Sequence, residues 1–228
     1  MKILQLSVDD LSSDGLSSDD RSSLTRADQV AGALRTSILR GMVKPGEKLD
    51  QRQIAAELGV GRASVREALR TLAAEELVTL TLNRGARVTE RSIADLQDLQ
   101  FIRCLLEGAA ARRGAPRMDD RRLEKLAIVL EKADKSNDID EIFALNKTFH
   151  GTIYEAFPQP LLIDHIRLQR NKMTPYNRRY LERAGNKEAA WGGHRRIYEA
   201  CLRRDGKQAE VETINHLEQV FQGIVEAT

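Results

Sequence analysis

The sequence has few cysteines, prolines and aromatic residues, and it contains no long apolar run. Its 228 residues include 2 cysteines, 5 prolines and 4% aromatic residues, a balance that favours helices over sheets. No stretch is apolar for long enough to span a membrane, and the N-terminus lacks the apolar core and cleavage site of a signal peptide. Cys104 and Cys201 form no Cys-x-x-Cys pair. We expect two small buried side chains in a reducing, cytoplasmic setting.

The formal net charge is only +2, but it is unevenly distributed. Residues 1–24 hold two Lys/Arg and five Asp/Glu, which gives −3. Residues 25–91 hold twelve and eight, which gives +4, and residues 92–228 hold twenty-two and twenty-one, which gives +1. The positive charge is therefore concentrated in residues 25–91.

The chain divides into a tail and two domains. Residues 1–24 are rich in Ser and Asp and cannot bury enough apolar surface to fold, so we expect a disordered tail. In residues 25–91 the apolar residues Val30, Leu34 and Ile38 recur at helical spacing. Asp50 is placed to cap a second, short helix, and residues 77–90 alternate around Asn83-Arg84-Gly85 as in a β-hairpin.

The stretch GVGRASVREALRTL, residues 59–72, carries two ridges on one predicted helix. Val65, Leu69 and Leu72 form an apolar ridge that needs a core. The basic ridge needs water or an anion, and it consists of Arg62, Arg66 and Arg70. Two helices, a tight turn, this helix and a hairpin form the pattern of a winged helix-turn-helix, in which the arginine helix enters the major groove of DNA. Arginine there can pair with guanine or with phosphate.

Residues 92–228 are predicted to be helical almost throughout. We expect six helices joined by short connections, and hence an antiparallel all-α bundle, so that the fold class of the chain is mainly α. Ser92 and Asp95 resemble a capping box for the first of these helices. The predicted helices span residues 93–114, 119–135, 139–157, 160–183, 187–204 and 207–226.

Three of the four histidines have spacings that could bring them together. Asn146 and His150 lie four residues apart on one helix face. His194 and His216 lie about equally far from the turn at residues 205–207, and therefore at one level of a helical hairpin. Three imidazoles and one oxygen donor would suit Zn²⁺, with Ni²⁺ or Mn²⁺ as alternatives. Unrelated core or surface histidines remain the alternative, and His165 has no such partner.

The N-terminal segment resembles the DNA-binding domain of GntR-family transcription regulators. The resemblance rests on ILRGMVKPG at residues 38–46, on LGVGRASVREAL at residues 58–69 and on the Asn-Arg-Gly wing. Gly61 stands where the family usually has Ser or Thr, which removes a hydroxyl that could cap the helix, and Ser64 stands where Pro or Thr is common. For Arg70 a solvated side chain or an ion pair is expected. The resemblance implies DNA contacts from Arg52, Arg62, Ser64, Arg66 and Gly85.

The C-terminal segment resembles the FCD effector-binding domain of the FadR-like subgroup. The matching segments are NKTFHGTIYEAF at residues 146–157 and the stretch from His194 to Leu217. In metal-bearing members the ligands fall on Asn146, His150, His194 and His216. Asp is commoner than Asn at the first position, and a neutral amide would leave the ion's full charge for an anionic effector. Arg103 resembles a cavity position that could hold such an anion, and its alternative is an ion pair with Glu107.

These observations favour a ligand-responsive DNA-binding regulator. The family resemblance implies a repressor, because repression relieved by a small organic acid is common in the family. We expect it to be a homodimer on a palindromic operator, responding to a small carboxylate. The first alternative is an effector-independent DNA-binding protein with a purely structural metal. The second is a metal-dependent enzyme, and the absence of an evident general base beside the ligands argues against it.

Overall fold

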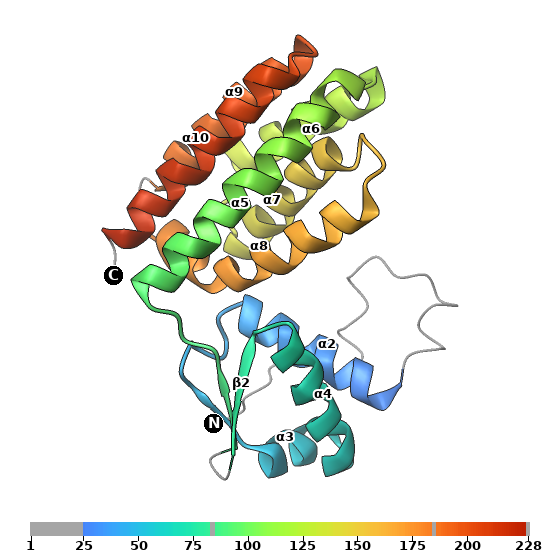
Figure 1. The fold of residues 1–228 in the computed structure, drawn as a ribbon, viewed down its shortest axis with the longest axis vertical. Helices are drawn as coiled ribbons and strands as arrows, with labels where there is room; N and C mark the ends of the chain where they lie inside the picture. The colour runs from blue at the N-terminus through green and yellow to red at the C-terminus, as the bar shows by residue number, and fades with distance from the viewer. Residues whose placement is uncertain (1–24, 83–84, 184–185, 227–228) are drawn as a thin grey trace. The chain divides into compact units, whose positions relative to one another are not determined.

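The computed structural model describes residues 25–82, 85–183 and 186–226. The predicted disordered tail, and Asn83 and Arg84 of the predicted turn, lie outside these ranges. The chain forms two compact units, which divide between Arg91 and Ser92. Each unit is described by itself below, and Figure 1 shows the elements of both.

Within residues 25–82 and 85–91, the N-terminal unit contains three helices and a three-stranded antiparallel sheet. The strand order is β1-β3-β2, with Val78 opposite Val88 and Lys48 opposite Arg87. The hairpin of β2 and β3 was predicted from the alternating pattern, whereas β1 was not, because a two-residue strand is too short to show a period. The elements are α2 (Arg26–Leu39), β1 (Lys48–Leu49), α3 (Gln51–Leu58), α4 (Arg62–Ala74), β2 (Val78–Thr81) and β3 (Gly85–Val88).

Side-chain caps determine where the first two helices of this unit begin. Thr25 forms a capping box with Asp28 at the start of α2. The carboxylate of Asp50 accepts hydrogen bonds from two backbone N–H groups in the first turn of α3. The N-cap of α4 is Gly61, which has no side chain to cap it. The exposed N–H groups at that end of α4 are thus left without a side-chain acceptor.

Apolar residues at helical spacing form the core between these elements. Val65, Leu69 and Leu72 of α4 are at most 1% exposed, and they pack with Leu34 and Ile54 from the other two helices. This core places the apolar ridge of α4 inside and leaves its arginine ridge outside.

The C-terminal unit is a bundle of α-helices, which confirms the predicted fold class. The predicted helix boundaries differ from the observed ones by three residues at most. The largest difference is at the end of α7, where Pro158 disfavours helical geometry in the residue before it. The capping box of Ser92 and Asp95 is confirmed. The helices are α5 (Ile93–Gly114), α6 (Asp120–Lys135), α7 (Ile139–Tyr154), α8 (Pro160–Leu181), α9 (Asn186–Leu202) and α10 (Gly206–Val225), with a 3-10 turn, η2 (Ala115–Arg117), between α5 and α6.

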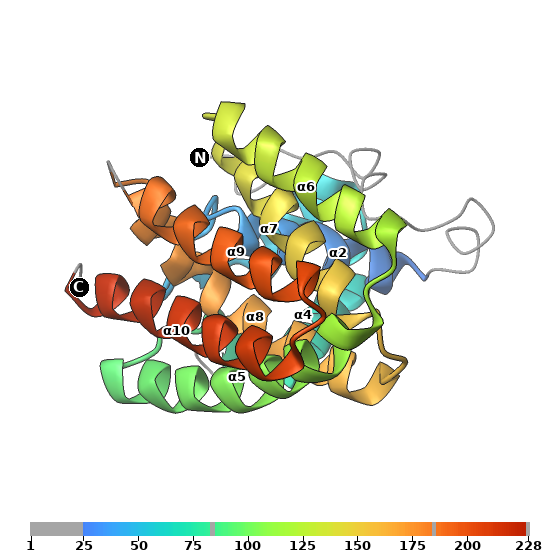
Figure 2. The same ribbon diagram turned by 90° about the horizontal axis from the view of Figure 1, so that it is seen from above.

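Helix α10 packs along both α5 and α9, as Figure 2 shows. Close approach of α9 to α10 depends on Gly193, because a Cβ there would lie 2.5 Å from His216 Nδ1. Of the two cysteines, Cys201 is buried as predicted. The same prediction is wrong for Cys104, which is only partly buried because it lies at the outer seam between α5 and α10.

Candidate functional site

The first candidate site is the outer face of α4. Arg62, Arg66 and Arg70 are all exposed, one turn apart, on the face opposite the core. Arg70 binds Glu67 at 2.8 Å, which agrees with the ion pair expected for it. Within the described residues no acidic side chain pairs with Arg62 or Arg66. Two planar guanidinium groups are therefore free to bind an anion or a base edge.

The other predicted DNA-contact residues lie in the same unit, on α3, on α4 itself and at the start of β3. Arg52 is exposed in the first turn of α3, and Ser64 is half-buried in the first turn of α4. Gly85 begins β3 with φ at +84°, a conformation that side chains with a Cβ rarely adopt. Arg52 and Ser64 are thus on the predicted helix-turn-helix, and Gly85 is in the predicted wing.

The second candidate site is a group of three histidines inside the bundle. Ring nitrogens of His150 (α7), His194 (α9) and His216 (α10) all lie within 4.8 Å of one another. The rings of His194 and His216 are 4.4 Å apart, so these two residues do lie at one level of the helical hairpin. Each of the three is at most 3% exposed. His165 is exposed on α8 and does not belong to this group.

Hydrogen bonds on the far side of two rings fix which nitrogen carries the proton. The Tyr154 hydroxyl donates to Glu107 Oε2 at 3.0 Å, so it can only accept at its 3.0 Å contact with His150 Nδ1. His194 Nδ1 contacts the carbonyl oxygen of Ala190 at 3.0 Å and must donate to it. Both rings therefore carry hydrogen on Nδ1 and a bare lone pair on Nε2.

The two bare nitrogens face each other. His150 Nε2 and His194 Nε2 are 3.1 Å apart in a buried site. Two lone pairs at this distance repel each other unless a cation or a proton lies between them. Ligand nitrogens on a tetrahedral Zn²⁺ lie about 3.3 Å apart, given metal–nitrogen distances of about 2.0–2.1 Å. A backbone carbonyl or hydroxyl on the opposite nitrogen is also the usual support of a metal-binding histidine.

Burial keeps the three imidazoles neutral. It lowers the pKa of His150 and of His194 well below the usual 6.5, and it lowers the pKa of His216 to about 3. Nearby positive charges act in the same direction, with Arg170 foremost for His150 and Arg103 foremost for His216. Neutral imidazole is the form that binds a metal, and His216 Nδ1 has no hydrogen-bond partner within the described residues.

The fourth predicted ligand, Asn146, lies beside the histidines. Its amide nitrogen is 3.1 Å from His194 Nε2, and its oxygen accepts a hydrogen bond from Arg170 at 2.5 Å. The amide thus presents its N–H, and not its oxygen, to the bare imidazole nitrogen. An oxygen ligand at this position requires the amide to turn over.

A buried ionic network lies next to the site. Glu107 is 0% exposed and accepts from Arg103 at 2.7 Å, from Arg170 at 3.0 Å and from Tyr154. Burial alone would raise the pKa of Glu107, but the two arginines hold it below the usual 4.5. The ion pair that was the alternative for Arg103 is therefore present. Its Nε makes this bond, and within the described chain neither of its Nη groups has an acceptor.

Comparison with known proteins follows the same division of the chain. The family model "Bacterial regulatory proteins, gntR family" matches residues 26–88, and the FCD domain model matches residues 98–219. The chain belongs to the GntR family of bacterial regulatory proteins, with an FCD domain. It is 27% identical over 201 residues to the HTH-type transcriptional repressor RspR of Escherichia coli K12, covering 86% of this chain and 87% of RspR.

A further relative supports the assignment of this GntR-family chain, and a solved structure shares its fold. The gluconate operon transcriptional repressor of Bacillus subtilis is 36% identical over 149 residues, which cover 62% of this chain and 56% of the repressor. The solved structure of E. coli McbR/YncC matches the fold with a TM-score of 0.78 at 22% identity, covering 89% of this chain and 98% of McbR/YncC. The chain is thus a DNA-binding transcription regulator and not an enzyme. No described helix has the length and apolar character required to cross a membrane.

Sequence reasoning missed two residues that the GntR-family chain places beside its histidines. Tyr154 continues the row of Asn146 and His150 at a spacing of four, and this periodicity could have revealed it. Arg170 lies between Ile166 and Met173 on the buried face of α8, so a charge at a core position was the available signal. Their roles depend on contacts with α5 and α7, which no local pattern contains.

Proposed function

We propose that this regulator is a metal-dependent repressor that senses a small organic acid. In this proposal residues 25–91 bind a palindromic operator as part of a homodimer, and residues 92–228 hold the metal and the effector. The metal ligands are Asn146, His150, His194 and His216, with Zn²⁺ as the first choice and Ni²⁺ or Mn²⁺ as alternatives. The main observation that supports a metal is that two unprotonated imidazole nitrogens face each other at 3.1 Å in a buried site.

The donor set suits a divalent ion. Three neutral imidazoles and an amide oxygen supply no negative charge, so a bound ion keeps its charge of +2. When bound, the ion would supply this charge, and a coordination number above four would leave a position for a carboxylate. Turning the Asn146 amide presents its oxygen to the site and removes the acceptor that Arg170 now uses. Arg170 and the free Nη groups of Arg103 are then available to a carboxylate.

The effector is tested by titrating the metal-loaded protein with small carboxylic acids. We expect one acid to raise the melting temperature, because a ligand at about 100 times its Kd stabilises by about 2.7 kcal/mol. The same acid should release a fluorescent operator duplex. In Arg103→Lys the positive charge stays but the planar fork is lost, and we expect acid affinity to fall about tenfold or more.

Arg121→Lys, an exposed position on α6, is the control and should bind the acid as the wild type does. Equal acid affinity in Arg103→Lys would refute the role of Arg103. If metal binds but no acid changes either stability or operator affinity, the metal is structural and the protein binds DNA without an effector.

The DNA contacts are tested on α4 with matched alanine variants. Arg62→Ala and Arg66→Ala should each weaken operator binding about 5- to 150-fold, the range for losing an arginine–base or arginine–phosphate contact of about 1–3 kcal/mol. Arg70→Ala removes an exposed arginine from the same helix that is already paired with Glu67. We expect it to change affinity by less than about twofold. Fluorescence anisotropy at fixed salt measures all three, and an equal loss in the Arg70 variant would argue against base reading by the other two.

A further inference from the structure

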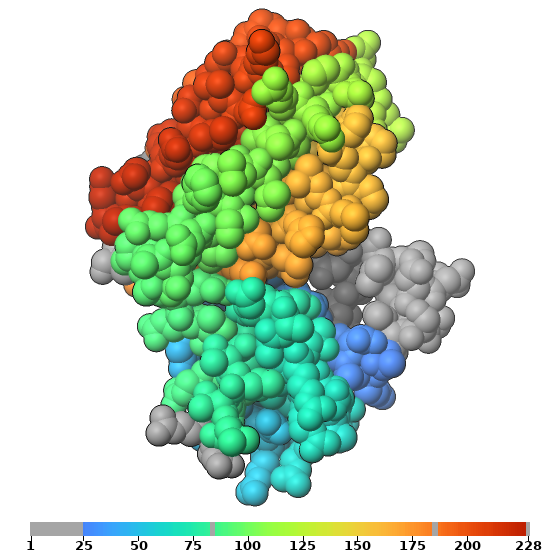
Figure 3. Space-filling view, in the orientation of Figure 1, coloured from blue at the N-terminus to red at the C-terminus, as the bar shows by residue number. Residues whose placement is uncertain are grey.

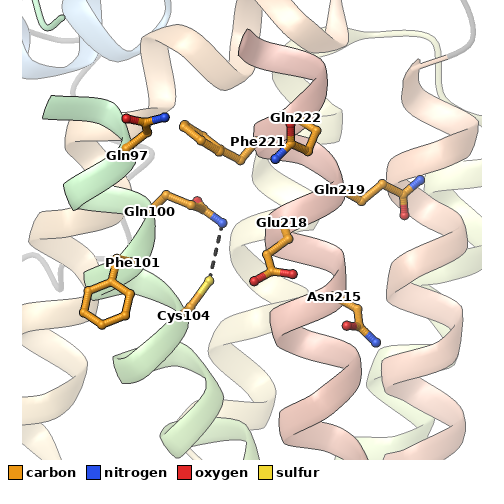
Figure 4. Close-up of a pocket in the computed structure, with 9 residues that line it drawn as sticks. All are labelled: Gln97, Gln100, Phe101, Cys104, Asn215, Glu218, Gln219, Phe221 and Gln222. Carbon is orange, nitrogen blue, oxygen red and sulfur yellow. Dashed lines mark hydrogen bonds between the residues drawn. The ribbon is translucent and has the colours of Figure 1, made fainter. Parts of the chain in front are cut away.

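The exposed large apolar side chains of the described chain include a group on α5 and a pair on the hairpin of β2 and β3. In the α5 group, Phe101 borders a groove between α5 and α10, and Figure 4 shows the Glu218 carboxylate in the same groove. A carboxylate at that place repels the phosphates of DNA. The pair on the hairpin is Leu80 and Leu82, and it belongs to the unit that binds DNA.

The pair continues the buried face of the hairpin beyond the core. Val78 and Val88 stand opposite each other, are at most 3% exposed and belong to the core of the unit. Two residues further along the same face, Leu80 is opposite Ala86 and is 45% exposed. Leu82 follows directly after β2, at the tip of the hairpin, and is 89% exposed. A strand face that leaves the core usually changes to polar side chains, whereas this one stays apolar, so its end suits contact with another molecule.

The charges around the hairpin favour an anionic partner. Lys48 of β1 and Arg87 of β3 are paired across the sheet, and both are exposed. The described strands β1, β2 and β3 contain no Asp or Glu. Strand β2 also contacts α4, which carries the exposed Arg62 and Arg66; Figure 1 labels both elements, and Figure 3 shows their surface in the same view. The leucine pair therefore continues the basic surface to which we assign the operator above.

We propose that Leu82 enters the minor groove of the operator as an apolar wedge, with Leu80 against the adjoining sugars. The proposal rests on the α4 contacts proposed above, since a hairpin beside a helix in the major groove meets the neighbouring minor groove. That groove is about 6 Å wide, which admits a side chain at the tip of a hairpin. The wedge goes beyond the α4 contacts, because it gives sequence preference to a residue that forms no hydrogen bond with a base.

This sequence preference arises from the stiffness of DNA. An apolar side chain inserted between base pairs partly unstacks them and bends the duplex. Unstacking costs less at pyrimidine–purine steps such as TA than in stiff A-tracts. Full burial of a leucine side chain corresponds to roughly ten- to hundredfold in affinity, and unstacking offsets part of that gain. We therefore expect Leu82 to favour a TA step beneath it over an AA step by about fivefold or more.

Selection from a pool of randomised duplexes locates the step. The wild-type chain should enrich a half-site for α4 together with a pyrimidine–purine step at a fixed distance from it. Leu82→Ser should enrich the same half-site without that step. Fluorescence anisotropy then compares two selected duplexes that differ only at the step, TA against AA, and Leu82→Ser should bind both equally.

A second readout reports the wedge itself. With the fluorescent base 2-aminopurine at the step, the wild-type chain should raise the fluorescence as the base unstacks, and Leu82→Ser should not. Leu82→Met keeps a long apolar side chain and should retain both the step preference and the fluorescence change. Leu82→Lys adds a positive charge, so it should tighten binding to all duplexes without preferring TA.

Leu161→Ser is the matched control, because this leucine of α8 is 77% exposed and lies in the C-terminal unit. It should bind all duplexes as the wild type does. Because Leu82 is also exposed, Leu82→Ser should keep the wild-type melting temperature, and a change in its DNA affinity then does not arise from unfolding.

Each outcome decides the proposal. Loss of the TA preference in Leu82→Ser, with its retention in Leu82→Met, supports the wedge. An equal loss of affinity on the TA and AA duplexes overturns it, because the side chain then contacts DNA without unstacking it. If Leu82→Ser keeps full affinity and preference while Arg66→Ala loses binding, the wedge is wrong and the α4 contacts stand. If both variants bind as the wild type does, the assigned DNA face is wrong as a whole.

Discussion

A His194→Ala variant is expected to bind its divalent ion about two to three orders of magnitude more weakly than the wild type. A structural zinc site contributes about 10–16 kcal/mol, so one of four ligands accounts for roughly 2.5–4 kcal/mol. His194 has the strongest case for this test, because its Nε2 lies 3.1 Å from both His150 Nε2 and the Asn146 amide. The measurement is a competition titration against a chromophoric chelator, with metal content determined by mass spectrometry.

His165→Ala is the matched control for this measurement. It removes an imidazole from the same domain, but from an exposed position outside the cluster. Its metal affinity should equal that of the wild type, and its melting temperature should change little. Full metal content and affinity in His194→Ala would contradict the proposed site. Equal losses in both variants would mean that the ion is not held by the buried cluster alone, because His165 lies outside it.

The DNA-binding half of this protein could be predicted from sequence in most of its detail. Val65, Leu69 and Leu72 recur at a spacing that only a helix places on one face, so burying them puts the arginines of α4 outside. The helices that pack against α4 are close to it in the sequence, and only residues 59–61 connect α3 to α4. Strand β1 escaped prediction because its pairing with β3 joins residues about forty positions apart.

The histidine cluster of the C-terminal unit was only partly predictable from sequence. That His194 and His216 lie at the same height in the helical hairpin follows from counting residues to the turn between α9 and α10. The tautomer of His150 could not be predicted in this way. It is set by the hydrogen bond to Tyr154, whose hydroxyl is oriented in turn by Glu107 from a different helix. From the sequence, Glu107 could be predicted only as a possible ion-pair partner of Arg103, four residues away on the same helix. Its burial beneath a second arginine, Arg170, required the packing of α8 against α5.

The row from Glu107 through Tyr154 to His150 links an ion pair to the candidate metal site. Because Tyr154 donates its hydroxyl hydrogen to Glu107, the Tyr154 oxygen can only accept a hydrogen bond from His150 Nδ1. The carboxylate therefore sets which ring nitrogen is bare, although it touches no histidine itself. Because Glu107 is buried and paired with two arginines, removing its charge should lower the free energy of unfolding.

Glu107→Gln is expected to destabilise the protein by about 3–5 kcal/mol. The substitution keeps the size of the side chain but leaves Arg103, which is 5% exposed, without its counter-charge. Urea unfolding of chelator-treated protein measures the loss without a contribution from metal. Glu131→Gln is the control, since it breaks another intrahelical pair four residues apart, with Lys135, on an exposed surface. We expect no measurable change there.

The pH dependence separates the effect of the Glu107 charge from the effect of its hydrogen bonds. The two arginines hold the pKa of Glu107 in the folded protein below the usual 4.5, so the ionised carboxylate stabilises the fold. This contribution is complete above about pH 4.5 and is lost as the pH falls through the folded-state pKa. The stability difference between wild type and Glu107→Gln should therefore stay constant from neutral pH down to about 4.5 and shrink below it. A difference that persists unchanged at lower pH would mean that the hydrogen bonds of the carboxyl group, and not its charge, make Glu107 necessary.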